Sequence, residues 1–310
     1  GGFPDKTLSD RIENAGARVV ITADGASRNA EIVSFKESYT DPALDQYISV
    51  SSAKTVLASA NIDDTLRQQI LERVSDALAG EITVTRADVM REAGHVLARA
   101  GQASESIAES RAILAEALSR APSRIDHVIV VKHVGLADIA WRAERDVWAH
   151  ELLATAQSRV LEAANLTDRS QLEQLSDADL VTALWKSVKP EPLPADFPLF
   201  IIYTSGSTGK PKGVVHVHGG YTAGISHTMK VSFDARPGID VIWVVADPGW
   251  ITGQSYLISA ALTNRITSII TEGAPVFPNS GRFASIIERH GVTIFKAGVT
   301  FLKGIMSNPQ

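Results

Sequence analysis

The sequence contains no cysteine, which excludes disulfide bonds, thiolate metal ligands and thiol catalysis within its 310 residues. It also lacks an excess of basic charge. The formal net charge is −5, so composition gives no sign of a nucleic-acid partner. No apolar run approaches the roughly 20 residues that a membrane-spanning helix needs. We therefore predict a cytoplasmic protein with neither a membrane nor a nucleic-acid partner.

What is present is typical of a soluble globular protein, with 45% hydrophobic and 21% charged residues. The length allows one large domain or two modest ones. Residues 5–24 predict a helix followed by a strand, and residues 125–131 predict a further strand. Strands that alternate with helices indicate an α/β fold with a parallel sheet.

Residues 49–122 have a different pattern, because their apolar residues recur at helical spacing. This pattern predicts three or four amphipathic helices packed as a small bundle. Thr85 and Asp88 resemble a capping box in which Asp replaces Glu or Gln. A second, shorter expansion occupies residues 153–190 and is also helical. Both segments are either neutral elaborations or docking surfaces for a neighbouring domain.

The most informative segment is 203–213, with the sequence Tyr-Thr-Ser-Gly-Ser-Thr-Gly-Lys-Pro-Lys-Gly. It follows an apolar run at 197–202 that we predict to be a buried strand. Glycines let backbone N–H groups approach a bound group, while hydroxyls and two lysines add donors and positive charge. Such a loop after a strand is typical of a site for phosphate oxygens. A flexible linker is the alternative, but a linker needs neither the preceding strand nor the two lysines.

The segment is not a Walker A loop. That motif has four residues between its first Gly and its Gly-Lys pair, and Ser or Thr after the Lys. Here Gly206 and Gly209 are too close together, and Pro211 follows Lys210.

Several ordered motifs carry a resemblance to the AMP-forming acyl-CoA synthetases, a branch of the adenylate-forming enzymes. Residues 203–213 resemble the phosphate-binding loop of that family. Other motifs along the chain resemble those of acetyl- and propionyl-CoA synthetases: 1–3, 11–12, 20–24, 127–132, 141–148, 216–221, 246–256, 272–275 and 282–283. The resemblance therefore extends over most of the chain.

The resemblance implies a domain organisation. Residues 1–48 and 123–310 correspond to α/β parts of the large N-terminal domain of an adenylate-forming enzyme, and residues 49–122 to a helical insertion. Motifs that the family carries downstream, and its C-terminal domain, are not in the sequence. We therefore expect an internal piece of a longer protein, with an incomplete active site. An insertion and internal-looking ends both fit a resemblance to the ligase part of a multi-domain propionyl-CoA synthase, which implies neighbouring catalytic domains of the same chain as partners.

The implied activity is the ATP-dependent, AMP-forming activation of a short carboxylic acid, followed by transfer of the acyl group to CoA. ATP, CoA and Mg are the implied cofactors. Such a reaction needs neutralised phosphate charge and correct positioning. Thr208 and Lys212 are the candidate catalytic side chains, and Lys210 is expected to be a solvated charge. The candidate phosphate contacts are Thr204, Ser205, Gly206, Ser207 and Gly209.

The residues Trp250, Ile251 and Thr252 resemble the acyl-pocket segment of the family, with Trp250 as a plain core residue the alternative. Acetate-specific relatives commonly carry Val where Ile251 stands, but one methylene shifts specificity by only about 1–3 kcal/mol. Residues 296–303 depart from the Thr-Ala-Pro-Thr-type motif of acetyl-CoA synthetases. This departure favours propionate or 3-hydroxypropionate over acetate.

Arg28 occupies the place of the first of two family arginines near the 3′-phosphate of CoA, and a solvated surface arginine is the alternative. The second place holds Glu31, whose carboxylate would repel that phosphate. His216 and His218 alternate on an expected extended run and could chelate, but no third ligand is near, so we predict no metal site. Residues 144–146 are predicted to be a solvated charged face.

Two rival functions remain. An adenylating enzyme that passes its acyl group to a carrier protein is one, although the motifs after Asp247 argue against it. The other is a truncated ligase domain that acts mainly as a nucleotide-binding or docking scaffold.

Overall fold

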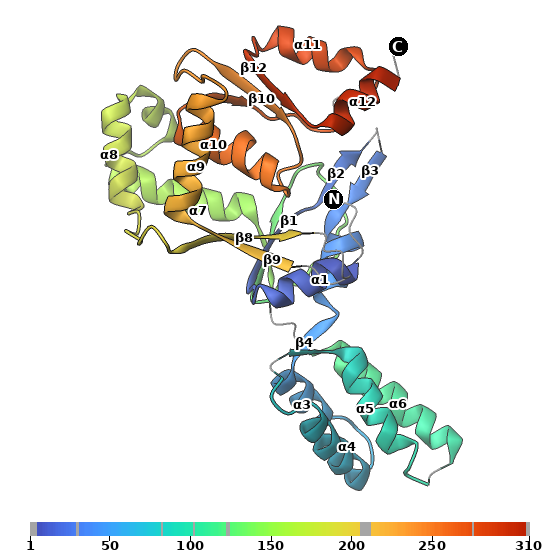
Figure 1. Ribbon diagram of the computed structural model, residues 1–310. Coiled ribbons are helices and arrows are strands. Elements are labelled where there is room, and N and C mark those ends of the chain that lie inside the picture. The colour runs from blue at the N-terminus through green and yellow to red at the C-terminus, as the bar shows by residue number, and fades with distance from the viewer. Residues whose placement is uncertain are drawn as a thin grey trace. The chain divides into compact units, whose positions relative to one another are not determined.

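A computed structural model describes residues 5–28, 31–81, 83–101, 103–121, 125–204, 212–274 and 276–307. The chain divides into two compact units. Unit 1 comprises Gly1–Ala26 and Ser34–Ala156, and unit 2 comprises Ser27–Val33 and Gln157–Gln310. Each unit combines helices with parallel strands (Figure 1), which confirms the predicted α/β class. Within the described ranges, no helix is both long and apolar enough to span a bilayer.

The sheet of unit 1 has three parallel strands in the order β1-β6-β7. Val128 and Val130 of the central strand are buried, and they pack with Leu44 and Ile125 in a small apolar core. The elements of this part of unit 1 are α1 (Asp5–Asn14), β1 (Val19–Ala23), η1 (Lys36–Thr40), α2 (Asp41–Leu44), β6 (His127–Val131) and β7 (Asp146–Trp148). Helix α7 (Ala149–Ala163) begins in unit 1 and ends in unit 2. A strand after a helix at 5–24 and a strand near 125–131 match the sequence pattern.

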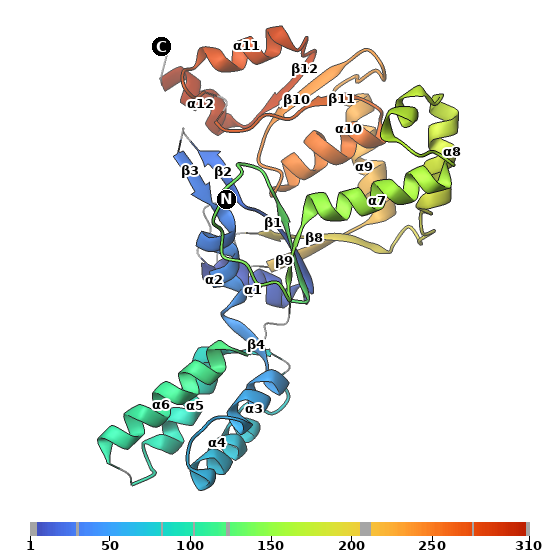
Figure 2. The same cartoon turned by 180° about the vertical axis from the view of Figure 1, so that it is seen from behind.

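Four further helices of unit 1 lie side by side (Figures 1 and 2), with successive helices in contact and α3 against α6. They are α3 (Val50–Ala58), α4 (Asp64–Ala77), α5 (Arg86–Leu97) and α6 (Ser104–Ser119). Their shared core includes the apolar residues Leu57, Ile70 and Leu114, and Glu92 and Ser110 are buried polar residues of the same helices. The predicted capping box is present, because Thr85 Oγ1 accepts from the N–H of Asp88 and the carboxylate of Asp88 accepts from the N–H of Thr85.

Arg86 makes hydrogen bonds to the segment that enters this bundle and to the segment that leaves it. Its backbone N–H donates to the carbonyl of Gln46 at 3.1 Å. Its side chain donates to the carbonyls of Leu118 and Ala121, both at 2.7 Å. Beside this junction β4 (Tyr47–Ser49) pairs antiparallel with β5 (Thr83–Thr85). The chain therefore enters and leaves the bundle at nearly the same place.

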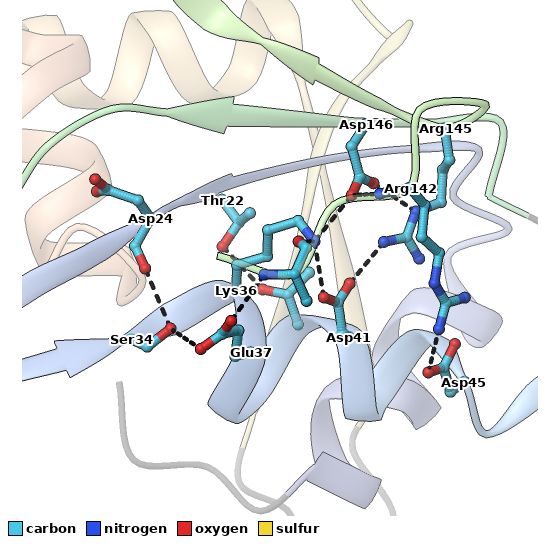
Figure 3. A network of polar contacts seen from close by, with 12 residues as sticks. Thr22, Asp24, Ser34, Lys36, Glu37, Asp41, Asp45, Arg142, Arg145 and Asp146 are labelled. Atoms are coloured by element: carbon cyan, nitrogen blue, oxygen red, sulfur yellow. Dashed lines mark hydrogen bonds and ion pairs between the residues drawn. The ribbon is translucent and has the colours of Figure 1, made fainter. Parts of the chain in front are cut away.

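A closed ring of alternating charges lies inside unit 1 (Figure 3). The ammonium of Lys36 contacts the carboxylates of Asp41 and Asp146, each at 2.8 Å. Arg145 completes the ring, at 2.6 Å from Asp41 and 2.7 Å from Asp146. The side chains of Lys36 and Asp146 are both 0% exposed. Burial opposes ionisation of Asp146, but hydrogen bonds from Arg145 and Lys36 outweigh it and hold its pKa below the ordinary value.

The prediction of a solvated face at residues 144–146 is wrong for two of its members, since Arg145 and Asp146 are buried. The reason is pairing. Each charge in the ring touches two charges of opposite sign, which offsets the cost of removing it from water.

A second buried carboxylate of unit 1, that of Asp24, is held by backbone groups instead of by charges. Its two oxygens accept hydrogen bonds from backbone N–H groups at 2.7–3.1 Å, and the donors are Gly25, His133, Val134, Gly135 and Leu136. Burial alone would raise the pKa of this carboxyl, but the N–H groups lower it from 3.8 to about 2. Asp24 thus fixes the loop that follows β6 to the end of β1.

The Asp24 carboxylate predicts a specific acid sensitivity. Its pKa is lower in the folded state, so its stabilising effect is complete above about pH 4 and is lost as the pH falls towards 2. Asp24→Asn should be less stable than wild type at pH 5, and the difference should shrink between pH 4 and pH 2. Urea unfolding at several pH values measures this. The pKa of Asp240 is lowered to about 2 as well. The test therefore compares the unfolding free energies of wild type and Asp24→Asn at each pH, because both proteins contain Asp240. A difference that stays constant with pH would contradict the assignment.

Unit 2 contains a parallel sheet in the order β11-β10-β12 and an antiparallel hairpin of β8 and β9. Its elements are η2 (Arg169–Gln174), α8 (Asp177–Ser187), β8 (Pro198–Thr204), β9 (Lys212–Val217), α9 (His218–Val231), β10 (Val241–Val245), η3 (Gly253–Ser259), α10 (Ala260–Thr263), β11 (Thr267–Ile269), α11 (Gly281–Arg289), β12 (Ile294–Ala297) and α12 (Val299–Ser307). Ile242 and Val244 of β10 pack with Ile225 and Met229 of α9 in the core of this unit. β2 (Gly25–Arg28) and β3 (Glu31–Ser34) form a separate two-stranded sheet.

The predicted strand at 197–202 exists as β8, but the prediction that it is buried is wrong. Leu199 and Ile201 are 38% and 42% exposed. Within the described residues β8 pairs with β9 alone, so no further strand extends the sheet, and these side chains remain partly open to solvent.

Candidate functional site

The described parts of the segment at 203–213 are the end of β8, Tyr203 and Thr204, and the start of β9, Lys212 and Gly213 (Figure 1). Thr204, the last residue of β8, is the register partner of Lys212, the first residue of β9. Directly opposed residues of an antiparallel pair project from the same face, with Cβ atoms roughly 5 Å apart. The hairpin therefore sets a hydroxyl and an ammonium side by side, and both residues are exposed.

In the next register pair of the hairpin, Tyr203 with Gly213, position 213 requires glycine. A Cβ at Gly213 would lie 2.8 Å from Cγ2 of Ile201 and 3.2 Å from Cε1 of Tyr203. The absence of a side chain at 213 lets the Tyr203 ring cover the strand. Gly213 thus preserves the close cross-strand packing directly before the Thr204–Lys212 pair.

Most of the predicted phosphate contacts fall on residues 205–211, which lie outside the described residues. They are Ser205, Gly206, Ser207, Thr208 and Gly209, and the predictions for them remain predictions. The side chain of Arg28, in β2, also lies outside the description. Thr204 and Lys212 are therefore the members of this predicted set whose positions the structure gives.

On the face that carries Thr204 and Lys212, an aromatic group follows. Phe200 and His216 are register partners whose rings stack with centroids 4.8 Å apart. Tyr221 of α9 packs edge-on against Phe200, also at 4.8 Å. These rings fix the start of α9 against the hairpin through non-polar contacts.

A pocket of about 480 Å³ opens beside this aromatic group. His216 and Tyr221 line it from one side, and Ile251, Ser255 and Tyr256 line it from the other. The structure therefore brings one of the predicted acyl-pocket residues, Ile251, to the same pocket as residues that follow the phosphate segment. A volume of this size is in the range of small-molecule sites.

The three predicted acyl-pocket residues differ in environment. Trp250 is 53% exposed, which rules out the alternative that it is a plain core residue. Ile251 is 38% exposed and lines the pocket, and Thr252 lies directly before η3. The turn that precedes them is held by Asp247, whose carbonyl accepts from the N–H of Trp250 at 3.0 Å.

Two polar residues of the pocket were not predicted as site residues, although both lie in motifs noted above. The hydroxyl of Tyr221 donates to Oγ of Ser255 at 3.0 Å. Ser255 is 4% exposed, so this hydrogen bond is largely shielded from water. No spacing rule connects them, because they are 34 residues apart and belong to α9 and η3. The pocket thus has largely apolar walls, with polar groups from His216, Thr228 and the Tyr221–Ser255 hydroxyl pair.

The two histidines considered as metal ligands do not share an extended run. His216 is in β9, but His218 is the first residue of α9, so the strand alternation that would align them ends at Val217. Among the described residues no group of three or more His, Asp or Glu could hold a metal ion.

The divergent segment at 296–303 begins with Lys296 in β12. Its ammonium lies 4.6 Å from the ring centroid of Tyr256 and 5.3 Å from that of Phe233. A cation over two ring faces is attracted by their quadrupoles. Lys296 therefore packs against the ring that forms one wall of the pocket.

Comparisons of the sequence with known proteins identify a family and several relatives. The sequence pattern of the AMP-binding enzyme family matches residues 1–310. The acetyl-coenzyme A synthetase of Streptomyces coelicolor is 35% identical over 306 residues, which cover 99% of this chain and 31% of that protein. The enzymes of the same name from Photobacterium profundum and Saccharophagus degradans are 39% and 40% identical over 183 residues, which cover 59% of this chain and 24% of each relative.

The chain thus spans about a quarter to a third of the length of these curated relatives. A family match over the whole chain, together with a hairpin that presents Thr204 and Lys212 at the glycine-rich segment, leads to one assignment. The chain belongs to the AMP-binding enzyme family.

Proposed function

We propose that this chain is part of a ligase that activates a short carboxylic acid with ATP, releases pyrophosphate and transfers the acyl group from AMP to CoA. The observation that carries the proposal is the register of the β8–β9 hairpin, which pairs Thr204 with Lys212 at the two ends of the phosphate-type segment. Family membership supports the use of ATP, and relatives named acetyl-coenzyme A synthetase support the reaction class.

The chemistry assigns a role to each end of the segment. The acid's carboxylate attacks the α-phosphorus, and the bond from that phosphorus to the bridging oxygen of pyrophosphate breaks. The Lys212 ammonium would neutralise charge on the phosphate oxygens, while the hydroxyls of Thr204 and Thr208 would donate hydrogen bonds to them. Backbone N–H groups of Ser205, Gly206, Ser207 and Gly209 would complete the cradle.

The acid is proposed to occupy the pocket lined by Ile251. Trp250 and Thr252 would position it there, as the resemblance implies. Propionate and 3-hydroxypropionate are the first candidates, on the evidence of Ile251 and of the divergent segment at Lys296. Acetate is the second candidate, and the names of the relatives favour it. The three acids differ by a methylene or a hydroxyl, so only a direct comparison distinguishes them.

CoA and Mg²⁺ enter as expectations of the proposal. Arg28 is the proposed contact for the 3′-phosphate of CoA. Glu31, at the start of β3, is exposed, so its carboxylate remains available to oppose that phosphate. The described residues offer no carboxylate cluster for a resident ion. We expect Mg²⁺ to arrive with the phosphates of ATP, as is usual for that ion.

The proposal predicts that Lys212→Ala lowers acid-dependent pyrophosphate release by roughly 100-fold, the usual loss when one donor to a developing charge is removed. The assay uses the full-length protein with acetate, propionate and 3-hydroxypropionate, each with and without CoA. The matched control is Lys230→Ala, because Lys230 is an exposed lysine in the last turn of α9. Its activity should equal that of wild type.

The outcomes separate the hypotheses. Release that follows one acid and collapses only in Lys212→Ala supports the ligase and names its substrate. Equal losses in both lysine variants would contradict the role of Lys212. ATP binding without release for any acid would favour the alternative, a nucleotide-binding or docking scaffold.

The scaffold alternative has a structural observation of its own. Helix α8, within the second expansion, presents Val181, Leu184 and Trp185 at 50%, 43% and 58% exposure. Residues 49–122 are proposed to be an insertion relative to acetyl-CoA synthetases. Neighbouring catalytic domains of the same protein are the proposed partners of these two segments.

A further inference from the structure

A pocket of about 200 Å³ lies on the helical bundle of unit 1, between α4 and the C-terminal end of α5. It is lined by Gln69, Arg73, His95, Val96 and Arg99. Three of these five side chains can carry positive charge, and a fourth offers an amide. The pocket belongs to a part of the chain to which the ligase reaction assigns no role.

The positive charge of this pocket is unusual for its surroundings. Between residues 49 and 121 there are eight Lys and Arg but ten Asp and Glu, so the bundle as a whole is acidic. Several of its other arginines are already neutralised or committed: Arg67 pairs with Asp64, Arg91 with Asp88, Arg120 with Glu116, and Arg86 with backbone carbonyls. Arg73 of the pocket is paired as well, with Glu92, so among the described residues Arg99 is the arginine of the pocket without an ion pair.

The guanidinium of Arg73 is anchored by an ion pair with Glu92. Its Nε and Nη2 lie 3.0 and 2.8 Å from Oε2 of Glu92, whose side chain is only 9% exposed. Within the described residues its Nη1 has no partner. A guanidinium that is anchored on one edge loses little rotamer entropy when its other nitrogen binds an anion.

Arg99 adds a second guanidinium to the pocket, and the imidazole of His95 lies beside it. Neither side chain makes a hydrogen bond or an ion pair within the part of the chain that the structure describes, and both are exposed. Both lie near the C-terminus of α5, where cations are favourable because of the helix dipole. That effect explains charge on α5 alone. It does not explain why the pocket is shared with Gln69 and Arg73 of a different helix.

We propose that this pocket binds the phosphate or diphosphate group of a small molecule. Guanidinium groups recognise phosphate oxygens through charge-assisted hydrogen bonds, and more than one such group suits a dianion better than a single carboxylate. The volume is below the roughly 300 Å³ typical of sites for whole small molecules. The pocket therefore accommodates the anionic group, and the remainder of the ligand extends into solvent.

The test uses proton NMR of the histidine rings of the full chain, because His95 reports on this pocket alone. The His95 signal is assigned by its disappearance in His95→Gln. Pyrophosphate is then titrated at constant ionic strength. We expect a saturable shift of this signal, and Arg99→Gln should weaken the apparent affinity by about tenfold or more, as expected for a hydrogen bond to a charged group.

The matched control is Arg111→Gln. Arg111 is an exposed arginine of α6, and it does not line the pocket. Its titration should match wild type. No shift at His95, or equal weakening in Arg99→Gln and Arg111→Gln, would overturn the proposal. Repeating the titration in Lys212→Ala separates the two proposals, because a loss of phosphate binding at the hairpin leaves the His95 response unchanged.

Discussion

Asp146→Ala is expected to destabilise the protein by about 3–5 kcal/mol, which is the usual cost of removing one partner from a buried charge pair. The variant leaves the Lys36 ammonium, which is 0% exposed, with a single carboxylate. Arg145 loses its contact to Asp146 as well. Urea unfolding followed by circular dichroism measures the loss.

The matched control for this variant is Asp126→Ala in the same unit. Asp126 pairs with Arg18 at 2.7 Å, but the two side chains are 42% and 70% exposed. An exposed pair of this kind contributes at most about 1 kcal/mol. Equal losses for the two aspartates would show that burial of the ring contributes nothing.

A double variant tests the same ring without relying on one substitution. Adding Lys36→Met to Asp146→Ala removes the stranded cation and leaves the Asp41–Arg145 pair, at 2.6 Å. The losses of stability caused by substitutions within one ion-pair network do not add up to the loss in the multiple variant. The double variant should therefore lose clearly less stability than the sum of the single variants.

Gly253→Ala should cost at least about 3 kcal/mol, at the upper end of the usual range for an added methyl group. A Cβ at this position would lie 2.2 Å from the carbonyl oxygen of Asp247 and 2.8 Å from the nitrogen of Pro248. Both are backbone atoms, so no side-chain rotation relieves the overlap. The turn that carries Trp250 and Ile251 has to move instead.

Gly224→Ala is the control for this prediction. Gly224 is in α9, and a Cβ there would meet nothing within 4 Å. Alanine in a helix interior is favoured over glycine by roughly 0.5–1 kcal/mol, so this variant should be slightly stabilised. Unfolding monitored by tryptophan fluorescence compares the two. A loss below about 1 kcal/mol in Gly253→Ala would show that the turn adapts easily.

The sequence predicted well the features that depend on local patterns. The helical region at 49–122 and the capping box at Thr85 follow from periodicity and spacing. The strand before the glycine-rich segment was also found, but its burial was not. Burial depends on what covers a strand, and an apolar run at 197–202 carries no information about its neighbours.

The candidate site was predictable only where a motif is continuous in sequence. Thr204, Lys212 and Ile251 lie in such motifs, and the structure gives their positions. Tyr221 and Ser255 were missed because their hydrogen bond joins distant segments. The ring around Lys36 was missed for the same reason, since a charged triplet at 144–146 looks solvated until its partners at 36 and 41 are known.

The hydrogen bonds that Arg86 makes to both ends of the bundle shorten the loop that has to close before the buried charges of unit 1 meet. The contact between Asp41 and Arg145 spans 104 residues, and closing so long a loop is entropically costly. Helices α3–α6 make mainly local contacts, which form quickly. Once they have formed, Arg86 holds Gln46 and Ala121 together. The effective loop between Asp41 and Arg145 then contains only the short segments on either side of the bundle. The hydrogen bonds of Arg86 therefore lower the entropic cost of bringing Asp41 and Arg145 together once the bundle has formed.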